Sequence, residues 1–231
     1  MADAGILTNL LGTTATVTTI GQFLSGMFTV QKVQRQGTAG DISPFPFLMG
    51  TVGCALWLVY GQLKDDNMII YCNVIGTLLN ALYVLIFLRY VTNKGDLLRQ
   101  IIMSCVIMTV TLALAVLNVS TSEATENLGR ICILITLICC GSPMIALKHV
   151  IRTKSTETLP FPLILSMFLV CSQWWLYGIL TADVYMQIPN LLGTLLSLIQ
   201  LALFAVYPTN SLTSPSRPPS SAEHKYDLLK S

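Results

Sequence analysis

The sequence Asn73-Val-Ile-Gly76-Thr-Leu-Leu79 recurs 117 residues later as Asn190-Leu-Leu-Gly193-Thr-Leu-Leu196. The same shift aligns Trp57-Leu-Val-Tyr60-Gly61 with Trp174-Trp-Leu-Tyr177-Gly178, and Pro44-Phe-Pro46 with Pro160-Phe-Pro162 after a one-residue slip. The chain is therefore a duplicated unit, and we call residues 117 positions apart repeat-equivalent. An internal repeat in a membrane-spanning chain is typical of transporters whose binding site lies where the repeats meet.

The composition is that of a membrane protein. Charged residues make up 10% of the chain and hydrophobic residues 53%, whereas a soluble domain carries about 25% charged residues. Because about 20 apolar residues cross a bilayer, seven segments qualify as transmembrane helices. They span residues 5–30, 46–63, 68–88, 98–117, 128–147, 161–180 and 184–207.

The repeat divides these seven segments into three, one and three. Residues 5–92 form the first triple-helix repeat, residues 98–118 a linker transmembrane helix, and residues 127–208 the second repeat. Three crossings alone would deliver the second repeat upside down, and the linker restores its direction. The predicted fold is all-α, with two parallel triple-helix bundles related by an axis along the membrane normal.

The charges predict the orientation. Eleven of the thirteen lysines and arginines fall in the tail or in the loops after the first, third and fifth segments, and only Lys64 and Arg130 lie on the other side. Basic residues favour the cytoplasmic side. We therefore expect an extracellular or lumenal amino terminus and a cytoplasmic carboxyl terminus, without any nucleic-acid partner.

Two repeat-equivalent asparagines are the leading candidates for substrate binding. Asn73 and Asn190 lie near the middle of their segments, where a side-chain amide must find hydrogen-bond partners. Each amide has two donors and two acceptors, which suit neighbouring hydroxyl groups of a ligand. The alternative is that each amide bonds a neighbouring helix and stabilises the bundle.

The aromatic candidates are Trp57 and Trp174, which are also repeat-equivalent. An indole face packs well against an apolar C–H face of a ligand. The alternative role is a tryptophan in the interfacial belt, since both lie near helix ends. Cys54, whose equivalent is Cys171, lies close to Trp57, and we expect it to influence the width of the pocket.

The helix interiors contain no Asp, Glu, Lys, Arg or His. Proton relays and coupled pumps depend on such groups, so a passive, bidirectional carrier is the expectation. The seven cysteines all fall within apolar segments without metal-ligand spacing, and no catalytic triad or nucleotide-binding loop is present. We expect neither an enzyme nor a cofactor or metal site.

Together, these motifs resemble the SWEET family of sugar transporters, in its animal type. The resemblance covers residues 5–208 and rests on Ser142-Pro143, Lys154-Ser-Thr-Glu157, the proline pairs, the two Trp-x-x-Tyr-Gly runs and the two Asn-x-x-Gly motifs. It implies facilitative, bidirectional transport of monosaccharides, glucose first, and of disaccharides as a second class. It also implies that Asn73, Asn190 and Trp174 contact the sugar, and that the chain forms homo-oligomers.

The resemblance further implies a ring of hinges that let the two halves rock. Its members here are Gly26, Pro44, Pro46, Pro143, Pro160 and Pro162. Plant members of the family have proline where this chain has Gly26, although glycine also lets a helix bend. The alternative for the proline pairs is simple helix-start chemistry, and which proline of each pair bends stays open.

Two other classes of function remain as alternatives, a seven-helix receptor and a structural or trafficking membrane protein. The expected location is the plasma membrane, the Golgi membrane or both. Residues 209–231 are rich in Pro and Ser and predict a disordered cytoplasmic tail, which contains the sorting-signal pattern Tyr226-Asp-Leu-Leu229. Asn118-Val-Ser120 is a glycosylation acceptor close to the membrane.

Overall fold

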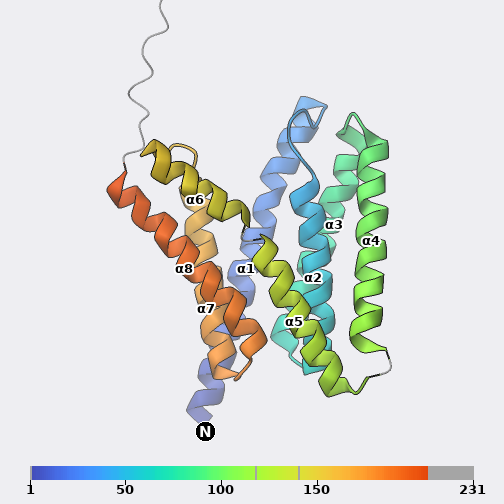
Figure 1. The fold of residues 1–231 in the computed structure, drawn as a ribbon, viewed down its shortest axis with the longest axis vertical. Coiled ribbons are helices and arrows are strands. Elements are labelled where there is room, and N and C mark those ends of the chain that lie inside the picture. Colours follow the sequence, from blue (N-terminus) through green and yellow to red (C-terminus); the bar gives the residue numbers. More distant parts are fainter. Residues whose placement is uncertain (1, 118, 140, 208–231) are drawn as a thin grey trace, which may run out of the picture.

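The computed structural model describes residues 2–117, 119–139 and 141–207 and shows an all-helical chain (Figure 1). The helices are α1 (Ala2–Gln36), α2 (Phe45–Lys64), α3 (Asn67–Tyr90), α4 (Lys94–Val116), α5 (Thr121–Cys139), α6 (Gly141–Thr153), α7 (Phe161–Leu180) and α8 (Val184–Val206). Asn118, the tail and its sorting-signal pattern lie outside the described residues.

Capping side chains set several helix starts. Asp66 accepts hydrogen bonds from the backbone N–H groups of Met68 and Ile69 at the start of α3. Its repeat-equivalent, Asp183, caps α8 in the same way. Such caps satisfy N–H groups that no helical carbonyl can reach. The duplicated sequence therefore produces the same local structure twice.

The helices form two bundles and a linker. Helix α3 contacts both α1 and α2 in the first bundle, and α8 contacts α5, α6 and α7 in the second. The linker α4 contacts α2, α3 and α5, and it lies beside α2 and α3 in Figure 1. The predicted arrangement of three, one and three helices is confirmed, and the bundles meet along two seams, α1 against α7 and α2 against α5.

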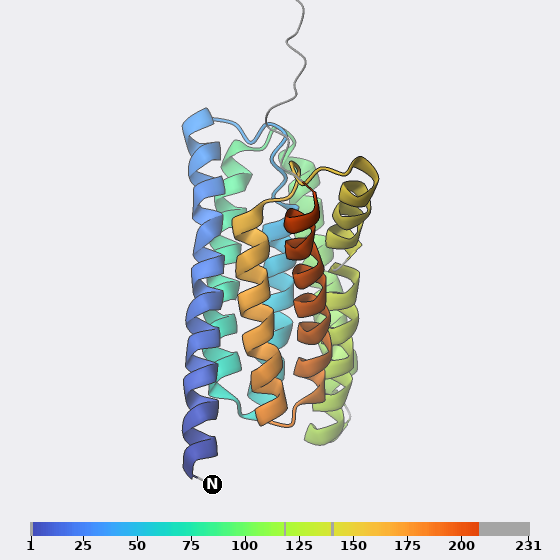
Figure 2. The same ribbon diagram turned by 90° about the vertical axis from the view of Figure 1, so that its left-hand side faces the viewer.

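We name the two ends of the molecule by their residues. The aspartate end carries Asp66 and Asp183, in the α2–α3 and α7–α8 connections, and it is at the bottom of Figure 1 with the amino terminus. The basic end carries the connections after α1, α3 and α6. Figure 2 shows α1 and α7 running side by side between these ends.

Within the described residues, six stretches are long and apolar enough to cross a membrane, namely α2, α3, α4, α7, α8 and Thr121–Thr153. Helix α1 is not among them, since it is rich in threonine. Its hydroxyls bond carbonyls of the preceding turn, as Thr13 does to Asn9 and Thr19 to Ala15, at 2.7 Å each. A helix can carry hydroxyls through a bilayer in this way.

The fifth predicted segment, residues 128–147, falls within the single apolar stretch Thr121–Thr153. The described residues of this stretch are α5 and α6, on either side of residue 140, and Pro143 lies in α6. Proline has no N–H group to donate to the preceding turn, so it weakens a helix on its N-terminal side. The sequence identified this proline as a weak point within the segment.

Candidate functional site

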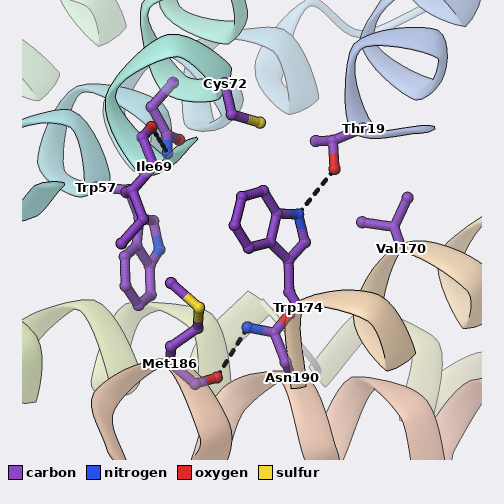
Figure 3. A pocket seen from close by; sticks show the side chains of 9 residues that line it. Thr19, Trp57, Ile69, Cys72, Val170, Trp174, Met186 and Asn190 are labelled. Atoms are coloured by element: carbon purple, nitrogen blue, oxygen red, sulfur yellow. Dashed lines mark hydrogen bonds between the residues drawn. The ribbon is translucent and has the colours of Figure 1, made fainter. Parts of the chain in front are cut away.

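A cavity of about 150 Å³ lies where the two bundles meet. Nine residues from five helices line it, namely Thr19, Trp57, Ile69, Cys72, Asn73, Val170, Trp174, Met186 and Asn190. Figure 3 shows the two indole rings turned toward the same space from different helices. Pockets for drug-sized ligands measure roughly 300–1,000 Å³, so this cavity suits a small ligand.

Both repeats contribute equivalent side chains to the cavity. Trp57 and Trp174 form one repeat-equivalent pair, and Asn73 and Asn190 another. Ile69 and Met186 are a third pair, one helical turn before the asparagines. The cavity therefore lies on the pseudo-twofold axis that relates the bundles. No Asp, Glu, Lys, Arg or His is among its lining residues.

Each asparagine bonds its own helix. Asn73 donates from Nδ2 to the Ile69 carbonyl, and Asn190 donates to the Met186 carbonyl, at 2.8 Å in both cases. No further hydrogen bond of either amide is found within the described part of the chain. One N–H and the carbonyl oxygen of each amide therefore stay available for a ligand. The interhelical bond that the sequence left open as an alternative is not made in this conformation.

The two tryptophans differ in their polar contacts. Trp174 is buried, and its Nε1 donates to Thr19 Oγ1 on α1 at 2.8 Å (Figure 3). Trp57 is half-buried, and its N–H finds no partner among the described residues. Trp174 is therefore held by a hydrogen bond between the bundles, whereas Trp57 can donate to a ligand.

Cys54 lies outside the nine lining residues. It is buried beside Gly76, where a Cβ added to the glycine would lie 2.7 Å from the cysteine sulfur. In the second repeat, a Cβ added to Gly193 would likewise lie 2.6 Å from the sulfur of Cys171. The cysteine that lines the cavity is Cys72. An influence of Cys54 on the width of the pocket stays a prediction, acting through the α2–α3 packing.

The proline pairs lie at the starts of the second helix of each bundle. Pro44 and Pro160 are the N-cap residues of α2 and α7, and Pro46 and Pro162 fall in the first turns. The two N-caps differ in conformation, since ψ is −10° at Pro44 and 93° at Pro160. This difference accompanies the one-residue slip in the repeat. The positions fit helix-start chemistry, and a hinge role stays a prediction.

Gly26 lies in the second half of the long helix α1, in close contact with two aromatic rings. A Cβ at this position would lie 2.8 Å from the Tyr83 ring and 2.9 Å from the Phe47 ring. Its repeat-equivalent, Pro143, is in α6, where Gln200 Nε2 donates to its carbonyl oxygen at 3.3 Å. Here glycine is required by close packing. Bending at Gly26 stays a prediction, because α1 is continuous through it.

The aspartate end is closed by two reciprocal hydrogen bonds between the bundles. The Tyr60 hydroxyl donates to the Asp183 carboxylate, with both oxygens at 2.8 Å. The Tyr177 hydroxyl donates to Asp66, whose oxygens lie at 2.9 and 3.1 Å. Lys64 lies 3.8 Å from Asp183, and this carboxylate is therefore bonded by a tyrosine and paired with a cation.

Ring contacts join this closure to the cavity. Trp57 meets Tyr60 edge to face, with ring centroids 5.3 Å apart, and Trp174 meets Tyr177 in the same way at 5.6 Å. Edge-to-face pairs of this kind stabilise a defined ring orientation. Each lining tryptophan therefore touches the tyrosine that bonds the opposite bundle.

Toward the basic end, a second cavity of about 570 Å³ lies between α1 and α7. Val170 lines both cavities, so they adjoin at this residue. Thr18, Gln22, Ser25 and Ser166 supply polar groups to its wall. The conformation is thus sealed at the aspartate end and less tightly packed toward the basic end.

Sequence reasoning missed Thr19, Ile69, Cys72 and Met186 as lining residues. Ile69 and Met186 carry no polar group, but they are repeat-equivalent and precede the asparagines by four residues. That shared position on the helix face could have revealed them. Thr19 also has a threonine equivalent, Thr136, whereas the equivalent of Cys72 is Pro189 and gives no such signal. Within the described residues, no cluster of His, Cys, Asp or Glu could hold a metal ion.

Comparison with known proteins places the chain in a family. The family model described as "Sugar efflux transporter for intercellular exchange" matches residues 9–95 and 126–212, once in each half. A solved structure, "The 3.7 A resolution structure of a eukaryotic SWEET transporter", is similar in fold, with a TM-score of 0.83 and 24% identity. It covers 90% of this chain and 99% of that one.

Three relatives carry the printed name "Sugar transporter SWEET1". The protein of Drosophila pseudoobscura pseudoobscura is 41% identical over 87% of this chain and 90% of its own length. The Caenorhabditis elegans protein is 39% identical over 88% of this chain and 67% of its own length. The Mus musculus protein is 33% identical over 90% of this chain and 95% of its own length. The chain therefore belongs to the SWEET family of multi-pass membrane transporters.

Proposed function

We propose that this chain carries a small neutral sugar passively across its membrane, in both directions, and that the sugar binds in the 150 Å³ cavity between Asn73 and Asn190. The observation that carries the proposal is the pairing of equivalent amides and indoles around an uncharged space. Membership of a family of sugar transporters supports the substrate class.

The lining chemistry suits a sugar. Trp57 and Trp174 offer apolar faces for the C–H groups of a pyranose ring. Asn73 and Asn190 each keep a donor and an acceptor for hydroxyls after bonding their own helices. The cavity volume favours a monosaccharide in this conformation, with glucose as the first candidate, and disaccharides would need a wider one.

Passive transport follows from the absence of charge. None of the side chains on which proton coupling depends, Asp, Glu, Lys, Arg or His, lines the cavity. Alternating access then needs only that the two ends open in turn around the bound sugar. The Tyr60–Asp183 and Tyr177–Asp66 bonds would break when the aspartate end opens, while Gly26, Pro44, Pro46, Pro143, Pro160 and Pro162 would absorb the change in helix direction.

The orientation and the location stay proposals. The basic residues at one end support placing that end in the cytoplasm, which makes the described conformation inward-facing. The plasma membrane and the Golgi membrane are both compatible with that orientation. A homo-oligomer is also proposed, and light scattering on the purified chain would test it.

The test is glucose flux into proteoliposomes made with the purified chain. We expect Asn73→Ala and Asn190→Ala each to lower flux by about tenfold or more, since each removes ligand hydrogen bonds worth about 1.5 kcal/mol. Asn80→Ser is the matched control: Asn80 bonds its own helix as Asn73 does but does not line the cavity, and its repeat-equivalent is Ser197. Normal flux in both alanine variants would refute the site.

A further inference from the structure

The two seams between the bundles are repeat-equivalent, but they differ in chemistry. The α1–α7 seam carries polar contacts. Thr18 Oγ1 donates to Gln173 Oε1 at 2.6 Å, and beside it Trp174 Nε1 donates to Thr19 Oγ1 at 2.8 Å. Further toward the basic end, Gln22 Nε2 lies 3.8 Å from the sulfur of Met167. All three contacts join one repeat to the other.

The α2–α5 seam is apolar at the same positions. The repeat-equivalents of Thr18 and Gln173 are Ile135 and Leu56. Leu56 is 1% exposed and belongs to a core cluster with Leu128 and Cys132, against which Ile135 packs. A pair that is hydrogen-bonded on one side of the molecule is therefore replaced by an apolar pair on the other.

The linker helix covers only the apolar seam. Ala115 of α4 belongs to the same core cluster, and Met108, Leu112 and Val116 of α4 pack against it. Within the described part of the chain, α4 contacts α2, α3 and α5 but neither α1 nor α7. Figure 2 shows α1 and α7 at the side of the molecule, adjacent to each other. The linker α4 thus covers the α2–α5 seam, whereas the α1–α7 seam is held together only by contacts between α1 and α7 among the described residues.

The polar pair lies at the depth of the central cavity. Thr18 and Gln173 immediately precede Thr19 and Trp174, which line that cavity. Thr18 also lines the cavity between α1 and α7, where these helices are less tightly packed toward the basic end. The Thr18–Gln173 bond therefore marks the point at which the uncovered seam closes.

We propose that Thr18 and Gln173 are the pivot of the seam that α4 leaves uncovered. They hold the two halves together beside the bound sugar while the ends open in turn. A hydrogen bond between two side chains fixes a distance but tolerates a change in helix crossing angle, because the side-chain torsions can follow. Neither residue lines the central cavity, so both act as positioning residues. The inference rests on the proposed alternating access.

The decisive variant combines Thr18→Ile with Gln173→Leu, which copies the Ile135–Leu56 pair of the other seam. The Thr18–Gln173 bond is part-buried, and replacing both partners of a hydrogen bond by apolar groups of similar shape can be nearly neutral for stability. We therefore expect a melting temperature close to that of the wild-type chain. In proteoliposomes, the maximal rate of glucose flux should be at least about fivefold lower than that of the wild-type chain. The KM for glucose should stay within about twofold of the wild-type value.

The single substitutions separate the hydrogen bond from packing. Thr18→Ser keeps the hydroxyl and should retain the wild-type maximal rate within about twofold. Thr18→Val removes the hydroxyl and leaves the Gln173 amide unpaired, so it should lower both the melting temperature and the maximal rate. Ile135→Val on the apolar seam is the matched control: it should lower the melting temperature slightly, because it removes a packed methylene, and leave the maximal rate unchanged.

A double variant that transports at the wild-type rate, or faster, would overturn the pivot, since the bond would then be dispensable or a latch that must break. A lower maximal rate in Thr18→Ser than in Thr18→Val would overturn it as well. These results are distinct from failure of the proposed function, in which the wild-type chain itself carries no glucose.

Discussion

The Tyr60 hydroxyl lies 2.8 Å from the Asp183 carboxylate of the other repeat, and the repeat-equivalent pair, Tyr177 and Asp66, makes the same bond in the opposite direction. Each carboxylate also caps the third helix of its own bundle, α3 or α8. When the aspartate end opens, each carboxylate must therefore lose the hydrogen bond from the tyrosine of the other bundle but can keep the bonds that cap its own helix. The bundles can then separate without unwinding α3 or α8.

The two tyrosines should not be equivalent in energy. Tyr177→Phe leaves Asp66 with only its capping N–H groups, whereas Tyr60→Phe leaves Asp183 with Lys64 at 3.8 Å as well. We expect each substitution to destabilise the chain by about 1–3 kcal/mol, with Tyr177→Phe the larger. Melting temperatures in detergent measure this order, and an equal or reversed order would contradict the role of Lys64.

Gly12 should be needed for closure at the aspartate end. A Cβ there would lie 2.7 Å from the Tyr177 ring and 2.9 Å from Met68. Gly12→Ala should displace the tyrosine at a cost of about 1–3 kcal/mol and lower glucose flux. In the same helix, Gly21 has nothing within 4 Å of an added Cβ, and Gly21→Ala is the control. Equal flux in the two variants would argue against the close packing.

The adjacent tryptophans Trp174 and Trp175 should differ in function. Trp174 lines the cavity and bonds Thr19, whereas Trp175 does neither. Trp174→Ala should raise the KM for glucose or abolish flux, since it removes the stacking face and the bond to α1. Trp175→Ala should keep KM within about twofold. Initial-rate measurements over a range of glucose concentrations compare them, and a larger defect in Trp175→Ala would refute the assignment.

Transport should not be coupled to an ion gradient. No Asp, Glu, Lys, Arg or His side chain lines the central cavity, so it lacks the groups on which proton coupling depends. Glucose should equilibrate across the proteoliposome membrane and not exceed the external concentration when a pH or sodium gradient is imposed. Uphill accumulation with either gradient would mean that the amides and hydroxyls of the cavity bind an ion together with the sugar.

The repeat explains why so much could be predicted from one sequence. Taken alone, Asn73 could serve helix packing and Trp57 the interfacial belt. Their repeat-equivalents Asn190 and Trp174 line the same cavity, which places both pairs around one pseudo-twofold axis. The seven segments and the parallel bundles follow from apolar length and from the number of crossings. These predictions needed no knowledge of side-chain contacts.

Contacts across the seams could not be predicted in this way. The sequence shows that Tyr60 and Asp183 each have an equivalent, but not that each tyrosine reaches the aspartate of the other repeat. The bond between Trp174 and Thr19 likewise depends on how α1 meets α7.

An experimental structure of the chain with glucose bound tests the central claim most directly. The account predicts density for one pyranose ring between Trp57 and Trp174, within hydrogen-bonding distance of the amides of both Asn73 and Asn190. Glucose bound elsewhere, with both amides directed at neighbouring helices, would contradict it.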